Sequence, residues 1–345
     1  MEEQAASASR ERRPVYLYIS SRGHSGSTFL SMLLARHPQV AAVGELAHLP
    51  LQVARDEKAS WIGRCSCGER PFDCTFWGPV LREIGQEQGV DLEARPFGWR
   101  ISDVGLEEEH RAAAPLRVPL VWARNRFWRL IRYGQYMLPA PLALPFMPYQ
   151  PQRKWGRNRA ILVEKIARAF KVDAVVDASK DPLDMIDVYR HAPLPVKIIY
   201  LTRDCRGNVW SMLKRLLPGE TRESRLVSAA NEWRSVNGRI WRLIRDVPQD
   251  AWLHVKYEDI CRQPSVELNR IFEFAGLEPI DVTAAISESA VDRHAHTIGG
   301  NRVRFTSDAI RIREDQAWRE NLTPDELAVI DRISGPLARE LGYEL

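Results

Sequence analysis

The stretch of this sequence best suited to chemistry is the polar loop SSRGHSGST, which spans Ser20 to Thr28. Glycines here permit positive φ values and close approach of the backbone to a bound group. A glycine-rich loop that leads into a helix N-terminus directs several N–H groups at one anion. The loop is therefore predicted to bind phosphate or sulfate. Its candidate ligands are glycines, hydroxyls and cations: Arg22, Gly23, His24, Ser25, Gly26, Ser27 and Thr28.

This loop differs from the Walker A pattern G-x-x-x-x-G-K-[ST], because no lysine follows Gly26. A nucleoside triphosphatase would lack its charge-bearing residue here. Taken alone, the loop is also compatible with an ordinary strand-to-helix turn.

A second candidate anion site follows the apolar run Val196 to Leu201, the most strand-like stretch of the chain. Arg203 comes directly after this run. Ser211 lies eight residues further on, within the first turns of a helix expected to begin near Asn208. The spacing can bring a guanidinium and a hydroxyl to one phosphate. A later Gly/Arg loop, GGNRVRF, adds further candidates: Asn301, Arg302 and Arg304.

A carboxylate, Glu45, follows the short apolar run Val40 to Val43. Ligands of α/β proteins bind beyond the carboxyl ends of the strands, so Glu45 is a candidate catalytic residue. The alternative is that Glu45 only caps the helix that follows it.

Three of the five cysteines lie close together: Cys65, Cys67 and Cys74. They could ligate zinc, but a structural site has four ligands and no fourth is obvious. Neither C-x-C nor C-x6-C is a standard finger spacing, so a compact loop of reduced thiols is the favoured interpretation. The odd number of cysteines favours a reducing cytoplasm over a disulfide framework.

Elements that position these residues alternate between strands and helices, which predicts an α/β fold with a parallel sheet covered by helices on both faces. Residues 1–14 are predicted to be a disordered lead-in, and 15–345 a single domain. The expected strands are 15–19, 40–43, 174–177, 196–201 and 252–256. The expected helices begin at 28 and near 208, and span 159–170, 225–246, 265–275 and 323–341.

The region from about 110 to 160 differs in composition from its surroundings. No acidic residue lies between Glu109 and Glu164, although the whole chain has a net charge of only +4. Aromatic residues interleave with arginines, and the proline-rich run LPAPLALPFMPYQP follows. We expect a packed insertion with a solvated basic face. A lid over the acceptor, or a surface for anionic lipid headgroups, are the functional alternatives.

No run approaches the roughly 18 apolar residues of a membrane span, and the N-terminus lacks the apolar core of a signal peptide. The expected location is the cytoplasm, with peripheral contact at the inner membrane face as an option. No nucleic-acid motif accompanies the basic region, so a nucleic-acid partner is not expected.

Together these segments resemble the sulfotransferases that use 3′-phosphoadenosine 5′-phosphosulfate, in particular the bacterial and carbohydrate-type branches. SSRGHSGSTFL is similar to their 5′-phosphosulfate loop. KIIYLTRDCRGNVWSMLKR is similar to their 3′-phosphate motif, in which Arg203 and Ser211 match the phosphate-binding pair. VVDASKDP and GGNRVRF resemble further segments, and VGEL places Glu45 where some branches carry a catalytic glutamate. His24 departs from the lysine or arginine of many members.

The resemblance covers Val15 to Glu45 and residue 173 onwards, and implies a P-loop-like fold without a metal requirement. The donor would be 3′-phosphoadenosine 5′-phosphosulfate and the product adenosine 3′,5′-bisphosphate. The acceptor would be a hydroxyl, with saccharides and lipid-linked glycans among the candidates. Glu45 would be the base, and protonated His24 would stabilise the leaving phosphate; the reverse assignment is the alternative. The competing functions are a P-loop kinase of a small molecule and a membrane-surface binding protein with a degenerate nucleotide pocket.

Overall fold

The computed structural model describes residues 13–55, 63–105, 151–214, 218–287, 296–305 and 312–345, together with positions 123, 127, 130 and 216. Nearly all of the predicted lead-in and most of the 110–160 region lie outside these residues. The predictions for the lead-in and for the insertion's contacts therefore stay predictions.

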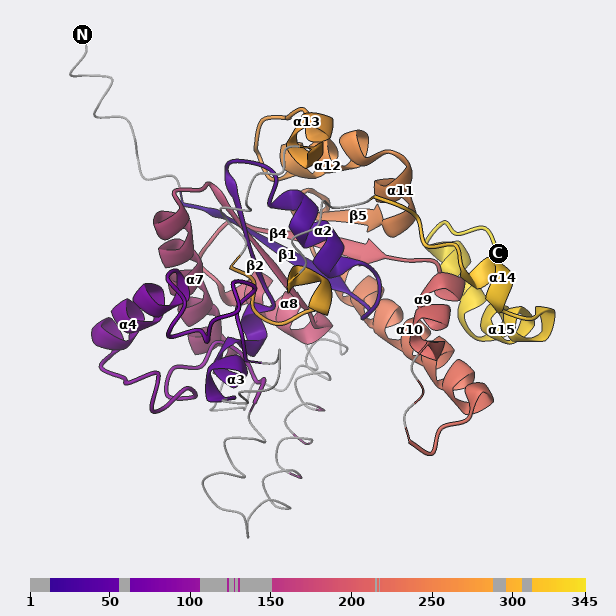
Figure 1. The fold of residues 1–345 in the computed structure, drawn as a ribbon, viewed down its shortest axis with the longest axis horizontal. Coiled ribbons are helices and arrows are strands. Elements are labelled where there is room, and N and C mark those ends of the chain that lie inside the picture. The colour runs from indigo at the N-terminus through magenta and orange to yellow at the C-terminus, as the bar shows by residue number, and fades with distance from the viewer. Residues whose placement is uncertain are drawn as a thin grey trace.

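Five parallel strands form the central sheet in the order β2-β3-β1-β4-β5 (Figure 1). Each strand coincides with an apolar run that was predicted to be a strand, and the predicted and observed ends differ by a few residues at most. Their bounds are β1 (Val15–Ser21), β2 (Val40–Gly44), β3 (Ala174–Lys180), β4 (Val196–Thr202) and β5 (Trp252–Lys256). The predicted α/β fold with a parallel sheet is confirmed.

Both faces of the sheet are buried, since alternate residues of each strand join two separate cores. On β1, Tyr16 and Tyr18 belong to one core, and Leu17 and Ile19 to the other. The first core is completed mainly by α4 (Trp77–Gln88), α7 (Pro151–Phe170), α8 (Pro182–His191), α9 (Cys205–Leu213), α10 (Arg222–Ile244) and α15 (Pro324–Glu340). The second is completed by α2 (Ser27–Leu34), α11 (Tyr257–Arg262), α12 (Pro264–Phe274) and α13 (Val282–Ser287).

Helix α7 corrects one boundary of the predicted insertion. It begins at Pro151 rather than at Arg159, so residues 151–160 are part of a helix packed on the sheet. Arg159, which lies in the basic stretch without acidic residues, is fully buried. Arg153 and Arg157, on the same helix, are exposed.

A buried polar network explains why Arg159 can lie inside. Its guanidinium donates to Asp177 Oδ2 at 2.6 Å and to both carboxylate oxygens of Asp184 at 3.2 Å. It also donates to the Tyr16 hydroxyl at 3.0 Å and to the Ile101 carbonyl at 3.2 Å. A buried charge is tolerated when it is paired and hydrogen-bonded in this way.

Helix termini follow local sequence signals. Asp181 caps α8 by accepting from the N–H groups of Leu183 and Asp184, with Pro182 at the first helical position. The capping box predicted at Thr323 and Glu326 is confirmed at the start of α15. Helix α9 begins at Cys205, three residues before the predicted start, because Asp204 caps it.

Candidate functional site

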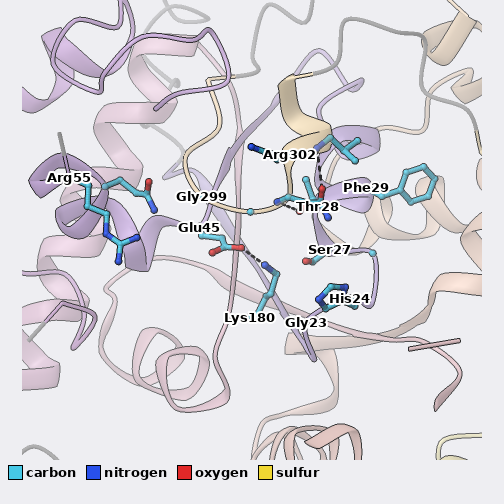
Figure 2. Close-up of a pocket in the computed structure, with 15 residues that line it drawn as sticks. Gly23, His24, Ser27, Thr28, Phe29, Glu45, Arg55, Lys180, Gly299 and Arg302 are labelled. Carbon is cyan, nitrogen blue, oxygen red and sulfur yellow. Dashed lines mark hydrogen bonds and ion pairs between the residues drawn. The ribbon is translucent and has the colours of Figure 1, made fainter. Parts of the chain in front are cut away.

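A cavity of about 570 Å³ lies at the carboxyl edge of the sheet (Figure 2). Its walls come from the loop after β1, from Glu45 after β2, from Lys180 at the end of β3, and from the segment Gly299 to Val303. Gln52 and Arg55, from α3 (Leu49–Ala54) and just after it, complete the lining. The carboxyl ends of neighbouring parallel strands thus converge on one site, as expected for α/β proteins.

The predicted anion loop has the geometry of a cradle. Gly26 adopts φ +89° and immediately precedes α2. A Cβ atom here would lie 2.8 Å from the Tyr257 ring, so both the backbone and the available space require glycine. Because Gly26 has no side chain to cap α2, the N–H groups of the first helical turn can bind a ligand. Ser27, Thr28 and Phe29 of this turn line the cavity.

The two predicted anion motifs meet at His24. Its Nδ1 lies 3.1 Å from the Ser211 hydroxyl, and its carbonyl accepts from Arg203 Nη1 at 3.3 Å. Surrounding protein desolvates the His24 ring and lowers its pKa below the usual 6.5, although the residue is exposed; the nearby cations Arg22 and Lys180 lower the pKa further. The imidazole of the ligand-free protein is therefore mainly neutral at neutral pH.

Arg203 is held between an aromatic ring and a carboxylate. Its guanidinium lies 4.7 Å from the centre of the Tyr257 ring and donates to Asp315 Oδ2 at 3.1 Å. Partial burial raises the pKa of Asp315, but the hydrogen bonds from Arg203 and the Ala317 N–H, together with the charges of Arg203 and Lys214, lower the pKa by more, so that the net pKa is lowered. An arginine fixed in this way is preorganised for a phosphate oxygen beside Ser211.

Glu45 stands at the N-cap position of the 3₁₀ turn η2 (Leu46–His48), but its side chain makes no cap hydrogen bond there. The capping alternative is therefore wrong. The Glu45 carboxylate instead pairs with the Lys180 ammonium inside the cavity (Figure 2). His48 Nδ1 lies 3.3 Å from its other oxygen, Oε2.

Lys180 is a site residue that our sequence reasoning missed. It ends β3 with φ +70°, a conformation uncommon for lysine, and its carbonyl accepts from the Ser20 hydroxyl. The sequence did contain a signal for Lys180. This residue comes shortly after the predicted strand 174–177, much as Glu45 comes after the predicted strand 40–43. The adjacency of β2 and β3 that joins the two residues is not evident from local sequence.

The Gly299–Val303 segment approaches both Glu45 and α2. Gly299 and Gly300 adopt φ +71° and +83°, and a Cβ on either would press on Glu45 or Thr28. The N–H of Asn301 donates to the Thr28 hydroxyl at 3.3 Å. Asn301 and Arg302 both line the cavity, and their contact with a donor stays a prediction.

Five predicted donor ligands are not among the described residues that line this cavity. Two of them, Arg203 and Ser211, contact His24, which does line it. The other three are Arg22, Ser25 and Arg304. Arg22 pairs with Glu232 at 2.6 Å, and Ser25 is buried beside the Asn208 amide. Arg304 is also buried and donates to the carbonyls of Gly299 and Arg64. Their contacts support the loops; direct contact with a donor stays a prediction.

Comparisons with known proteins find similarity to sulfotransferases. Residues 177–281 match the model of the "Sulfotransferase family". The chain is 24% identical to carbohydrate sulfotransferase 7 of Rattus norvegicus, over 98% of this chain and 75% of that protein. It is 30% identical to nodulation protein NoeE of Sinorhizobium fredii over 26% of this chain and 22% of that one. The sulfotransferase domain of the Synechococcus PCC 7002 olefin synthase aligns with a TM-score of 0.52 at 20% identity, covering 97% of each chain.

The fold is that of the sulfotransferases, and the matched segment contains Lys180, Arg203 and Ser211 of the site described above. The chain is thus similar to sulfotransferases in sequence and in fold. Within the part of the chain that the structure describes, no helix combines the length and apolar character that a membrane crossing requires.

Proposed function

We propose that the protein transfers the sulfuryl group of 3′-phosphoadenosine 5′-phosphosulfate to the hydroxyl of a saccharide acceptor. The observation that carries this proposal is the meeting of two anion-binding motifs at His24, with the Ser211 hydroxyl 3.1 Å from its ring. A donor with phosphates at both the 5′ and 3′ positions would engage both motifs. ATP has no 3′-phosphate to engage Arg203 and Ser211.

The residues present fit such a donor. The first turn of α2, which Gly26 leaves without a side-chain cap, would hold the 5′-phosphosulfate. Arg203 and Ser211 would hold the 3′-phosphate. The donor supplies an activated sulfuryl group, and positioning and electrostatics then dominate transfer, as they do for phosphoryl groups.

Three side chains, Glu45, Lys180 and His24, would assist the transfer step. The Glu45 carboxylate would accept the proton of the acceptor hydroxyl. The Lys180 ammonium, paired with it, both orients this carboxylate and adds positive charge where negative charge develops. His24 would become protonated beside the donor phosphates and would donate to the departing phosphate oxygen.

The similarity to a carbohydrate sulfotransferase supports a saccharide acceptor. Incubation with the donor and a panel of mono- and oligosaccharides, followed by mass spectrometry, should detect one or more sulfated products. Loss of the Glu45 base should lower transfer about 10²- to 10⁴-fold in Glu45→Gln, the usual contribution of general base catalysis. The affinity for adenosine 3′,5′-bisphosphate should stay close to that of the wild type.

Glu273→Gln provides a matched control, because Glu273 is exposed on α12 and is not among the residues that line the cavity. It should retain full transfer. Undiminished transfer by Glu45→Gln would show that another group is the base. Tight bisphosphate binding without transfer to any saccharide would contradict the proposed acceptor class.

A further inference from the structure

Four metal-binding side chains, distant in sequence, converge beside the active-site cavity: Cys65, Cys67, Cys74 and His296. One ligand atom from each lies within 4.8 Å of all the others. His296 Nδ1 is 3.2 Å from Cys74 Sγ and 3.6 Å from Cys65 Sγ, and the sulfurs of Cys67 and Cys74 are 3.6 Å apart. The fourth ligand that the sequence left unidentified is thus 222 residues beyond Cys74.

These separations match the edges of one tetrahedron. Zinc bonds of about 2.3 Å to sulfur and about 2.0 Å to nitrogen place tetrahedral ligands roughly 3.8 Å apart for two sulfurs and roughly 3.5 Å apart for sulfur and nitrogen. A disulfide would need its sulfurs about 2.05 Å apart. The observed cluster therefore has the spacing of ligands around one ion.

The surroundings hold the ligands in place. The Trp77 indole N–H donates to the His296 carbonyl at 2.7 Å. The Phe76 ring stacks on His296 at 5.4 Å between ring centres, which fixes the imidazole plane. Cys65 and Cys74 are buried. Outer contacts of this kind orient metal ligands and stabilise their charge.

We propose that Cys65, Cys67, Cys74 and His296 form a structural zinc site. Three thiolates and an imidazole are soft and borderline donors, which favour zinc over magnesium or calcium. Four protein ligands leave no coordination position open, so the ion stabilises structure and takes no part in the reaction. The proposed zinc site does not depend on the identity of the sulfuryl donor.

The zinc would fasten the 63–76 segment to the segment that lines the cavity. Directly after His296, the Ser66 N–H donates to the Thr297 carbonyl at 3.0 Å. Ile298 then exchanges bonds with β2 and the residue after it: its N–H donates to Val43, and its carbonyl accepts from Glu45. Gly299 follows at once in the cavity wall. One ion thereby fixes the loop that packs against the catalytic carboxylate.

Metal analysis of the full chain, purified under reducing conditions with zinc present, tests the proposal. The wild type should contain about one zinc per chain, as four-ligand structural sites do. Cys74→Ser and His296→Ala should lose it. Cys261→Ser, which alters a thiol on α11 outside the cluster, should keep it. Cobalt substitution should give the visible bands of a tetrahedral thiolate site.

A second measurement, made on the wild type, tests the proposal if the variants do not fold. In the zinc-loaded wild type, Cys65, Cys67 and Cys74 should resist a thiol reagent, and a chelator should make them reactive. Chelation should also accelerate hydrogen exchange at the Ser66 and Ile298 amides. A folded wild type without metal, a Cys67–Cys74 disulfide, iron in place of zinc, or zinc retained in both ligand variants would each overturn the proposal.

Discussion

His24 occupies the contact between the two anion motifs, and its protonation links donor binding to pH. Desolvation and neighbouring cations hold its pKa below 6.5 in the ligand-free protein, so the ring is mainly neutral at about pH 7. Donor phosphates beside the ring favour the imidazolium and raise this pKa. A bound donor should therefore take up part of a proton at His24.

This linkage predicts that bisphosphate affinity falls as pH rises through the donor-bound pKa of His24. Calorimetry in buffers of different ionisation enthalpy measures the proton uptake. Because the ligand phosphates also titrate, His24→Gln is the reference, and the wild type should take up more protons than this variant. His24→Lys keeps the cation and should retain substantial transfer. Equal proton uptake in the wild type and His24→Gln would show that His24 stays neutral.

The site residues that could be identified from the sequence are those whose partners lie close to them in the sequence. The glycines and hydroxyls of the cradle stand in one short loop, and Arg203 and Ser211 share one strand-to-helix junction. Lys180 and His296 were missed because their partners are distant: Glu45 lies in another strand connection, and Cys65 to Cys74 lie more than two hundred residues away. Spacing alone carries no signal of such contacts.

At the scale of elements, strand β3 positions Glu45 and Lys180 through Asp177. Its Oδ1 accepts from the Leu46 N–H at 3.1 Å and from the Ser179 N–H at 2.9 Å. The residues next to Glu45 and Lys180 are thereby tied to one buried carboxylate. Arg159 of α7 balances the charge of that carboxylate.

Removal of Arg159 should destabilise the fold strongly, because the buried Asp177 and Asp184 would lose their countercharge. Arg159→Met should lower the free energy of unfolding by about 3–5 kcal/mol, measured by denaturant titration. Arg157→Met changes an exposed arginine on the same helix and should alter it by no more than about 0.5 kcal/mol. Similar losses in both variants would contradict this role of the network.

Strands were predicted well because each is a short apolar run that ends in polar residues. Helices were predicted where caps or periodicity were clear, as for α15. The predicted start of α7 was wrong. A basic stretch with tryptophan indicates a surface insertion, unless the buried partner of Arg159 is known. That partner, Asp177, comes from a strand 18 residues further along the chain.

At the scale of the whole molecule, the strand order brings every predicted motif to one edge. Strand β1 lies between β3 and β4, so the cradle after β1 is flanked by Lys180 on one side and by Arg203 on the other. The proposed donor carries two phosphates, and this convergence would give the site one place for each of them.

The most direct test is calorimetric binding of adenosine 3′,5′-bisphosphate and of ATP to the same protein. The wild type should bind the bisphosphate much more tightly than ATP. Arg203→Ala should weaken bisphosphate binding about 10- to 150-fold, equivalent to about 1.5–3 kcal/mol for a charge-assisted contact, and should hardly affect ATP. Arg234→Ala, an exposed change on α10, should affect neither. Equal affinity for the two nucleotides, unaffected by Arg203→Ala, would contradict the account.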